Sequence, residues 1–240
     1  MNGNDVSKRS KPRTNLQRTA EMRLRILHAT IACLLEFGYA ATSTRQVTDR
    51  AEVSRGALLH HFPTRADLML ETAEYIVERQ NTFVRENTHQ LAKGVPRLVA
   101  ITERLYQTVS SDEGIALTQI MVGTALDREL REKFSDLWDR VERRQLDDIW
   151  ALARYAGIDD YDSIAAMCQL NQAATRGISI HMLFKSDRSK NAALDLLLDH
   201  KRRLVKRLQD EAGAGGELPQ RRDTARKGAR PSNGTARSAT

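Results

Sequence analysis

The sequence predicts an all-α protein, with a small N-terminal unit of three helices followed by a larger helical domain. Apolar residues recur every three or four positions, beginning with the run from Leu24 to Leu35, which is the spacing of one buried helical face. Proline is rare, with 5 residues in 240, whereas Ala, Leu, Arg, Asp and Glu are abundant, a composition that favours helices. Glycine and capping residues divide the chain into segments of helical length.

Local signals mark the ends of the first three helices. Gly38 can adopt the left-handed conformation that ends the first helix. Ser43 and Gln46 fit a capping box that opens the second. Ser54 can cap the third, and Pro63 cannot continue it because proline has no amide donor.

Similar signals divide the rest of the chain. Thr64 and Asp67 form a further capping box, Pro96 suits the first turn of a helix, and either Asp160 or Asp162 can cap the eighth segment. The predicted helices cover approximately residues 24–37, 44–51, 55–61, 64–84, 96–109, 115–124, 127–155, 160–184 and 190–209.

The second and third helices are joined by so short a turn that they form a helix-turn-helix. Val47, Val53, Leu58 and Phe62 can build its small core, and the other face of the third helix then points outward, where this motif class enters the DNA major groove. Arg55 on that face can form two hydrogen bonds to guanine or contact a phosphate. The residues predicted to contact DNA are Thr42, Ser43, Thr44, Arg45, Ser54, Arg55, Gly56, Ala57, His60, His61, Thr64 and Arg65.

The stretch from Leu24 to Leu68 resembles the DNA-binding domain of the TetR family of bacterial transcriptional regulators. The matching residues are Ile26, Leu27, Ala29, Glu36, Gly38, Tyr39, Thr42, Ser43, Arg45, Val47, Ala51, Val53, Ser54, Gly56, Leu58, His61, Phe62, Arg65 and Leu68. Thr48, Glu52 and Leu59 depart from the pattern, where alanine, glycine and tyrosine are usual. That tyrosine typically binds a phosphate, so Leu59 removes one expected contact worth on the order of 1 kcal/mol.

The resemblance implies a helix-turn-helix DNA-binding domain joined to a larger helical ligand-binding and dimerisation domain. The chain then divides into a basic disordered arm (1–19), the DNA-binding domain (20–66), the ligand-binding and dimerisation domain (67–210) and a disordered basic tail (211–240). The arm either follows the DNA backbone or minor groove, or is only a solvated leader. The tail either adds nonspecific DNA affinity or is only solvated.

The charge distribution agrees with a polyanionic partner at the N-terminal end. The net charge is +7, and residues 1–65 contain 11 Lys and Arg against 5 Asp and Glu. Residues 66–210 contain 21 against 23, so the larger domain is nearly neutral. A basic excess on the predicted DNA-binding end is what a nucleic-acid partner requires.

The last two predicted helices have the pattern of an oligomer interface. Small residues on the first permit close approach, and leucines on the second recur at heptad-like steps. The residues concerned are Ala165, Ala166, Ala173, Ala174, Gly177, Ser179, Leu194, Leu197, Leu198, Leu204, Val205 and Leu208. The alternative is core packing within one subunit, whereas the resemblance implies a four-helix bundle across a homodimer.

The resemblance also implies a small-molecule pocket among the middle helices. Large or polar residues on otherwise apolar faces are candidate ligand contacts: Tyr106, Gln119, Met121, Trp138, Gln169, Asn171 and His181. Each has the alternative of a core or interface position. We expect a moderately apolar effector, because such pockets are mainly apolar with a few polar anchors.

Other chemistries find little support in the sequence. Cys33 and Cys168 lie on apolar faces far apart, which indicates two buried, reduced thiols rather than a redox sensor. The histidines lack metal-ligand spacing and the chain has no phosphate-binding glycine motif, so we expect no metal, no cofactor and no enzymatic activity. The chain also has no signal peptide and no apolar run long enough to span a membrane, so we expect a cytoplasmic protein.

Together these features predict a homodimeric repressor that binds a near-palindromic operator and is released by a small-molecule effector. A transcriptional activator of the same family is an alternative. A different class, a helical adaptor or enzyme that uses the basic end to bind RNA or an acidic protein, is another. The sequence leaves open the operator, the target genes, the effector and the sign of regulation.

Overall fold

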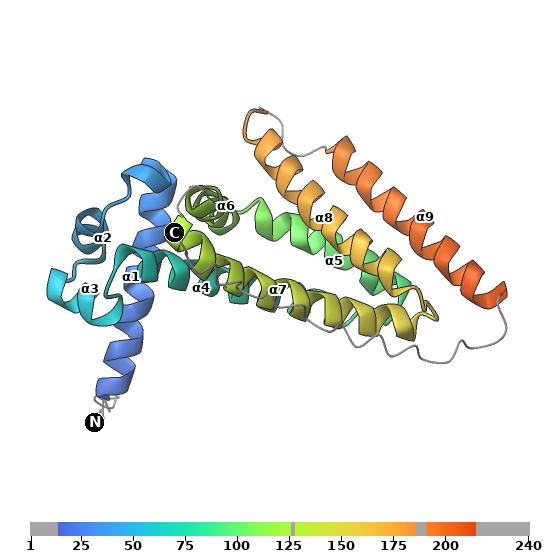
Figure 1. Cartoon of the computed structure of the whole chain (residues 1–240), viewed down its shortest axis with the longest axis horizontal. Coiled ribbons are helices and arrows are strands. Elements are labelled where there is room, and N and C mark those ends of the chain that lie inside the picture. Colours follow the sequence, from blue (N-terminus) through green and yellow to red (C-terminus); the bar gives the residue numbers. More distant parts are fainter. Residues whose placement is uncertain (1–13, 126–127, 186–190, 215–240) are drawn as a thin grey trace, which may run out of the picture.

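A computed structural model describes residues 14–125, 128–185 and 191–214, and these residues form helices without strands (Figure 1). The helices in this part of the chain are α1 (Asn15–Ala41), α2 (Thr44–Ala51), α3 (Arg55–His61), α4 (Arg65–Glu86), α5 (Val95–Val109), α6 (Asp112–Ala125), α7 (Arg128–Tyr155), α8 (Tyr161–Met182) and α9 (Ala192–Ala214). The all-α prediction is therefore confirmed.

The first three helices pack on one another at one end of the molecule (Figure 1). Helices α2 and α3 begin at the predicted residues, and α4 begins at Arg65, directly after its predicted cap Thr64. The side chains of Ser43, Ser54 and Thr64 each accept a hydrogen bond from a backbone N–H in the first turn of the helix that follows. The core of this unit consists of Ile26, Leu27, Ala29, Cys33, Val47, Ala51, Leu58, Phe62 and Leu68.

Helix α1 differs from the prediction at both ends. It begins at Asn15, because Thr14 and Gln17 form a capping box, so the predicted arm (1–19) overlaps it by five residues and its remaining residues 1–13 lie outside the described part. At the other end Gly38 has the predicted positive φ of 78°, but the chain forms one more helical turn to Ala41. The expectation that Leu24 and Leu35 are buried is wrong, because both are partly exposed on α1.

By length and composition alone, α1 is apolar enough to cross a membrane. Its apolar residues, however, are core residues of the folded protein. Leu27 and Cys33 are completely buried in the N-terminal core, and Leu34 is completely buried in a second core shared with α4, α6 and α7. The apolar character of α1 is therefore explained by packing within the protein.

The larger helical part contains that second core and a third one, built from α5, α7, α8 and α9. Helices α8 and α9 lie side by side, away from the N-terminal unit (Figure 1). Val205 and Leu208 of α9 are buried in the third core, and Leu197 and Leu198 are also buried within the single chain. Those four residues therefore follow the alternative of packing within one subunit.

Three further boundaries differ from the prediction by a few residues. Helix α6 begins at Asp112 instead of residue 115, because the Ser111 hydroxyl accepts from the N–H of Gly114 and permits an earlier start. Helix α8 ends at Met182, and Asp160 is the residue that caps it. Helix α9 extends to Ala214, so the first residues of the predicted tail are helical and residues 215–240 lie outside the described part.

Candidate functional site

Helix α3 is held against the N-terminal core by one face and leaves its other face free. Leu58 and Phe62 are completely buried and fix its orientation. The hydroxyl of Ser54 accepts a hydrogen bond from the N–H of Ala57 at 3.1 Å, which satisfies a donor at the start of the helix. Arg55 and His60 are exposed on the outer side, in the orientation that a groove-reading helix requires.

The turn before α3 is held by Arg25, which the sequence analysis did not single out. Glu52 adopts a left-handed conformation with φ 52°, which is uncommon for a residue other than glycine. The guanidinium of Arg25 on α1 donates to the carbonyl oxygens of Ala51 and, at 3.1 Å, of Glu52. Arg25 therefore anchors the turn to α1, a long-range contact that no local sequence pattern indicates.

Two residues predicted to contact DNA are instead used inside the protein. Thr42 is only 1% exposed, and its hydroxyl donates to the carbonyl of Gly38 at 2.8 Å. Arg65 donates from Nε to the carbonyl of Thr42 at 3.0 Å and from its terminal nitrogen to the carbonyl of Tyr39, and its guanidinium lies 4.5 Å from the centre of the Tyr39 ring. Both residues therefore stabilise the connection from α1 to α2, and their contacts with DNA stay a prediction.

The two histidines at the end of α3 differ in their surroundings. His60 is exposed, whereas His61 is half-buried. Burial lowers the pKa of His61, and the neighbouring His60 and Arg23 lower it further. His61 is therefore neutral at pH 7 and is available as a hydrogen-bonding group, not as a cation.

The remaining predicted contacts lie on or beside α2, α3 and α4, and together we call them the recognition surface. It combines the start of α2, the outer side of α3 and the start of α4, and Leu59 adds an exposed apolar side chain that the prediction omitted. Its residues are Ser43, Thr44, Arg45, Ser54, Arg55, Gly56, Ala57, Leu59, His60, His61 and Thr64. Hydroxyl and guanidinium groups around an apolar side chain suit phosphates at the edges and base edges at the centre.

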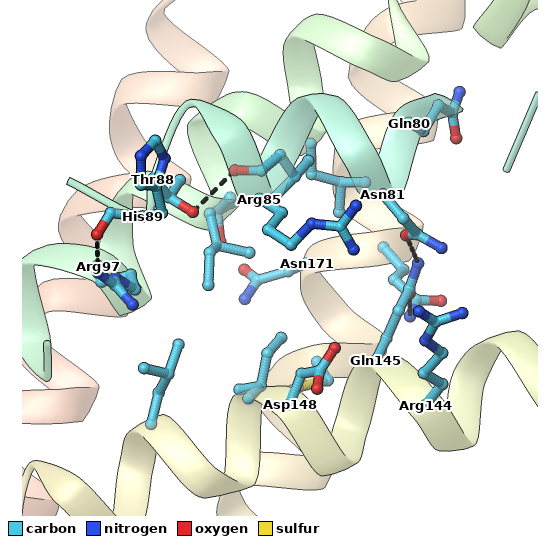
Figure 2. A pocket seen from close by; sticks show the side chains of 18 of the residues that line it. Gln80, Asn81, Arg85, Thr88, His89, Arg97, Arg144, Gln145, Asp148 and Asn171 are labelled. Atoms are coloured by element: carbon cyan, nitrogen blue, oxygen red, sulfur yellow. Dashed lines mark hydrogen bonds between the residues drawn. The ribbon is translucent and has the colours of Figure 1, made fainter. Parts of the chain in front are cut away.

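A cavity of about 310 Å³ lies in the larger helical part, between α4, α5, α7, α8 and α9. One side is crossed by a row of amides, in which Gln172 donates to Gln145 at 2.9 Å and Gln145 donates to Asn81 at 3.1 Å (Figure 2). Asn171 is buried among the lining residues of the same cavity (Figure 2). A volume of this size is appropriate for a small organic ligand.

Of the seven predicted ligand contacts, the structure places only Asn171 in this cavity. Trp138 donates to Glu142 at 2.8 Å and lies under the guanidinium of Arg176, while the hydroxyl of Tyr106 accepts from Asn191. Met121 packs on the second core, and Gln119 lies beside a groove between α1 and α6. The two others, Gln169 and His181, are exposed on α8. Six of the seven predicted ligand contacts therefore lie outside this cavity, and their role in ligand binding stays a prediction.

The cavity contains a buried charge that the sequence analysis did not predict. Lys201 on α9 is 1% exposed, and its Nζ donates to the hydroxyl of Thr102 on α5 at 2.7 Å. Burial lowers the pKa of Lys201 to about 8 and raises that of the neighbouring Cys168 to about 11, so near pH 7 the amine is mainly charged and the thiol is neutral. In the sequence Lys201 stands between charged residues and has the pattern of a solvent-exposed position.

The arrangement of α1, α2 and α3 is that of a helix-turn-helix domain. Residues 26–72 match the family model described as bacterial regulatory proteins, tetR family. An uncharacterized HTH-type transcriptional regulator of Mycobacterium bovis is 33% identical over 125 residues, which are 52% of this chain and 64% of that protein. This chain therefore spans less than two thirds of that relative. Over residues 26–72 the chain is therefore similar to the TetR family of bacterial regulatory proteins.

Other similar proteins agree with this assignment. The transcriptional regulator CymR of Pseudomonas putida is 29% identical over 189 residues, which are 75% of this chain and 88% of CymR. A transcriptional regulator from Rhodococcus has the same fold, with a TM-score of 0.63 and 19% identity over 77% of this chain and 96% of that one. Salmonella enterica GusR has a TM-score of 0.58 and 20% identity over 82% of this chain and 100% of GusR.

Proposed function

We propose that this protein is a cytoplasmic repressor that binds a near-palindromic DNA operator as a homodimer and is released by a small-molecule effector. The observation that carries the proposal is the recognition surface, where Arg55 is exposed on a helix whose other face is anchored by Leu58 and Phe62. Among the relatives, the KstR protein of Rhodococcus jostii, 27% identical over 129 residues, is named a transcriptional repressor.

An unpartnered face on α8 and α9 supports the homodimer. Exposed residues on α8 recur at steps of three and four positions, which is one continuous helical stripe. The stripe consists of Ala166, Leu170, Ala173, Gly177 and Ile180, and Phe184 follows two residues after the helix ends at Met182. Phe184 is 84% exposed, and Leu196 on α9 is 69% exposed. A second copy of the chain would cover these apolar side chains, and two-fold symmetry would present two recognition surfaces to one duplex.

Helix α4 connects the two sites of the proposed mechanism. Leu68 near its start is completely buried in the N-terminal core, whereas Val84 and Arg85 near its end line the cavity (Figure 1). A ligand that prefers one position of α4 would thereby favour one spacing of the two recognition surfaces. By linkage, an effector that weakens DNA binding must itself bind more weakly to the DNA complex.

Selection from a pool of random duplex DNA tests the proposal. Repeated rounds of binding to the purified full chain, followed by sequencing, should enrich an inverted repeat, because a two-fold dimer presents the same surface twice. Enrichment of a single unrepeated site would contradict the homodimer. Failure to enrich any duplex, with RNA bound equally well, would contradict operator recognition itself.

A further inference from the structure

Lys201 is a buried ammonium without an anionic partner. Its Nζ is bonded to the Thr102 hydroxyl, and in the described part of the chain no carboxylate pairs with it. The nearby Cys168 thiol supplies no counter-charge near pH 7, because burial raises its pKa to about 11. A buried charge without an opposite charge beside it is energetically unfavourable, because burial removes its hydration and nothing replaces it. An anion bound beside Lys201 would therefore stabilise the buried charge.

The other charges around the cavity reinforce this requirement. Arg85, Arg97 and Arg144 also line it, against Asp148 as the one carboxylate among its lining residues (Figure 2). Arg97 donates to the carbonyls of His89 and Leu91, while its buried Nε has no acceptor among the described residues. Arg144 lies 3.7 Å from Glu78, an exposed pair that leaves most of its charge uncompensated at the rim.

The rest of the lining is aliphatic. Between the polar groups, the wall consists of Val84, Ile101, Leu105, Ile149 and Leu152. A ligand with one anionic end and a compact hydrocarbon body would satisfy both kinds of lining at once. Lys201 is the one completely buried cation in the lining, and the volume of about 310 Å³ suits a compact ligand, so we favour a monoanion over a more highly charged phosphate ester.

We propose that this cavity binds a small aliphatic carboxylic acid, with its carboxylate at Lys201 and Thr102 and its hydrocarbon part against the aliphatic wall. One carboxylate oxygen accepts from Nζ of Lys201, and the buried amide of Asn171 is available to donate to the other. The identity of this acid as the effector rests on the proposed function, whereas its binding does not.

Calorimetric titration of the full-length protein tests the ligand class directly. The probes are butanoate, hexanoate, octanoate and cyclohexanecarboxylate, each compared with its primary amide and with the alkylamine of matched length. We expect at least one carboxylate to bind roughly tenfold or more tightly than its amide, as a charged hydrogen bond provides, and the amines not to bind. Equal affinity for acid and amide, no binding of any acid, or tighter binding of octyl phosphate would overturn the proposal.

Substitutions at two lysines of α9 locate the carboxylate. Lys201→Met keeps an unbranched side chain, one atom shorter, and removes the charge, and we expect it to abolish the preference for acid over amide. Lys206→Met, at an exposed position of the same helix, should retain the full preference. An unchanged preference in folded Lys201→Met would refute the assignment. If that variant does not fold, Thr102→Val provides the same test, with a reduced preference expected and an unaltered one counting against the site.

A DNA-release assay separates this inference from the proposed function. If the preferred acid also dissociates the protein from its selected duplex, both stand. If the acid binds with the predicted selectivity but does not release DNA, the carboxylate site stands and the role of the acid as effector falls. If the protein binds no duplex, the calorimetric result still decides whether the cavity is a carboxylate site.

Discussion

Arg55 is the residue on which sequence discrimination depends most. Its side chain is exposed at the start of α3, in the first turn after the Ser54 cap, where it reaches beyond the protein surface without a competing carboxylate in the described residues. We expect Arg55→Ala to weaken binding to the selected operator by about 1–3 kcal/mol, the value of a good bidentate contact to guanine, and to reduce discrimination between duplexes.

Fluorescence anisotropy with a labelled duplex measures this effect. Arg154→Ala is the matched control, because Arg154 lies in the last turn of α7 and pairs with Asp159, far from the recognition surface (Figure 1). The control should leave the affinity unchanged. If Arg55→Ala and the unsubstituted protein bind the duplex with equal affinity, Arg55 does not contact the DNA.

The buried Lys201 makes stability depend on pH. Its pKa falls from 10.5 when exposed to about 8 in the fold, so the unfolded chain binds more protons between these values and the free energy of unfolding rises with pH there. Cys168, with a pKa raised from 9.0 to about 11, acts in the opposite direction above pH 9. A net rise from Lys201 is therefore expected mainly from about pH 8 to 9, with a slope of at most about 1.4 kcal/mol per pH unit.

Urea unfolding of the protein and of Lys201→Met across this range isolates the contribution of the lysine. Cys168 titrates in both proteins, so its effect largely cancels in the difference. The stability advantage of Lys201→Met should be greatest near pH 7 and should shrink as the pH rises. Curves that stay parallel from pH 7 to 10 would show that burial does not lower the pKa of Lys201.

At the scale of the helices, α6 is fitted tightly against the end of α1. A Cβ on Gly123 would lie 2.1 Å from Cδ1 of Tyr39, and Arg65 stacks on the same ring. We expect Gly123→Ala to push α6 away from α1 and to lower the free energy of unfolding by about 1–3 kcal/mol, the usual effect of overpacking. Urea denaturation measures this, with Gly213→Ala as control because open space surrounds Gly213. Stability equal to that of the control would show that the contact is loose.

The apolar stripe on α8 gives a prediction about assembly. Ile180 is 43% exposed in the stripe, and we expect Ile180→Asp to dissociate the homodimer because a charge would be buried at the interface. Leu24→Asp is a control of similar exposure, 40%, on α1. Sedimentation velocity should find monomers only for Ile180→Asp. A dimer that persists in this variant would place the interface on another face.

Local chemistry explains which elements the sequence predicts well. The caps at Ser43, Ser54 and Thr64 act within one helical turn, so their helices begin where expected. Contacts between distant residues are not encoded in this way. The sequence around Arg65 predicts a DNA contact, whereas in the structure its guanidinium stacks on the Tyr39 ring. The sequence around Lys201 predicts an exposed lysine, whereas in the structure the packing of α9 against α5 buries it.

The ligand cavity is the part least accessible to sequence reasoning, because five helices contribute to it. Large or polar residues on apolar faces identified only Asn171, because the other candidates lie outside the cavity. Trp138 with Glu142 and Tyr106 with Asn191 are two such pairs. A polar residue on an apolar face predicts burial, but the packing of the helices decides what it is buried against.

At the scale of the whole molecule, the proposed homodimer must present two recognition surfaces to one face of a duplex. Hydroxyl-radical footprinting of the selected operator tests this requirement most directly. We predict two protected patches on the same side of the DNA, related by two-fold symmetry and about one helical turn apart. One protected patch, or two without that symmetry, would contradict the homodimeric recognition that the account places at its centre.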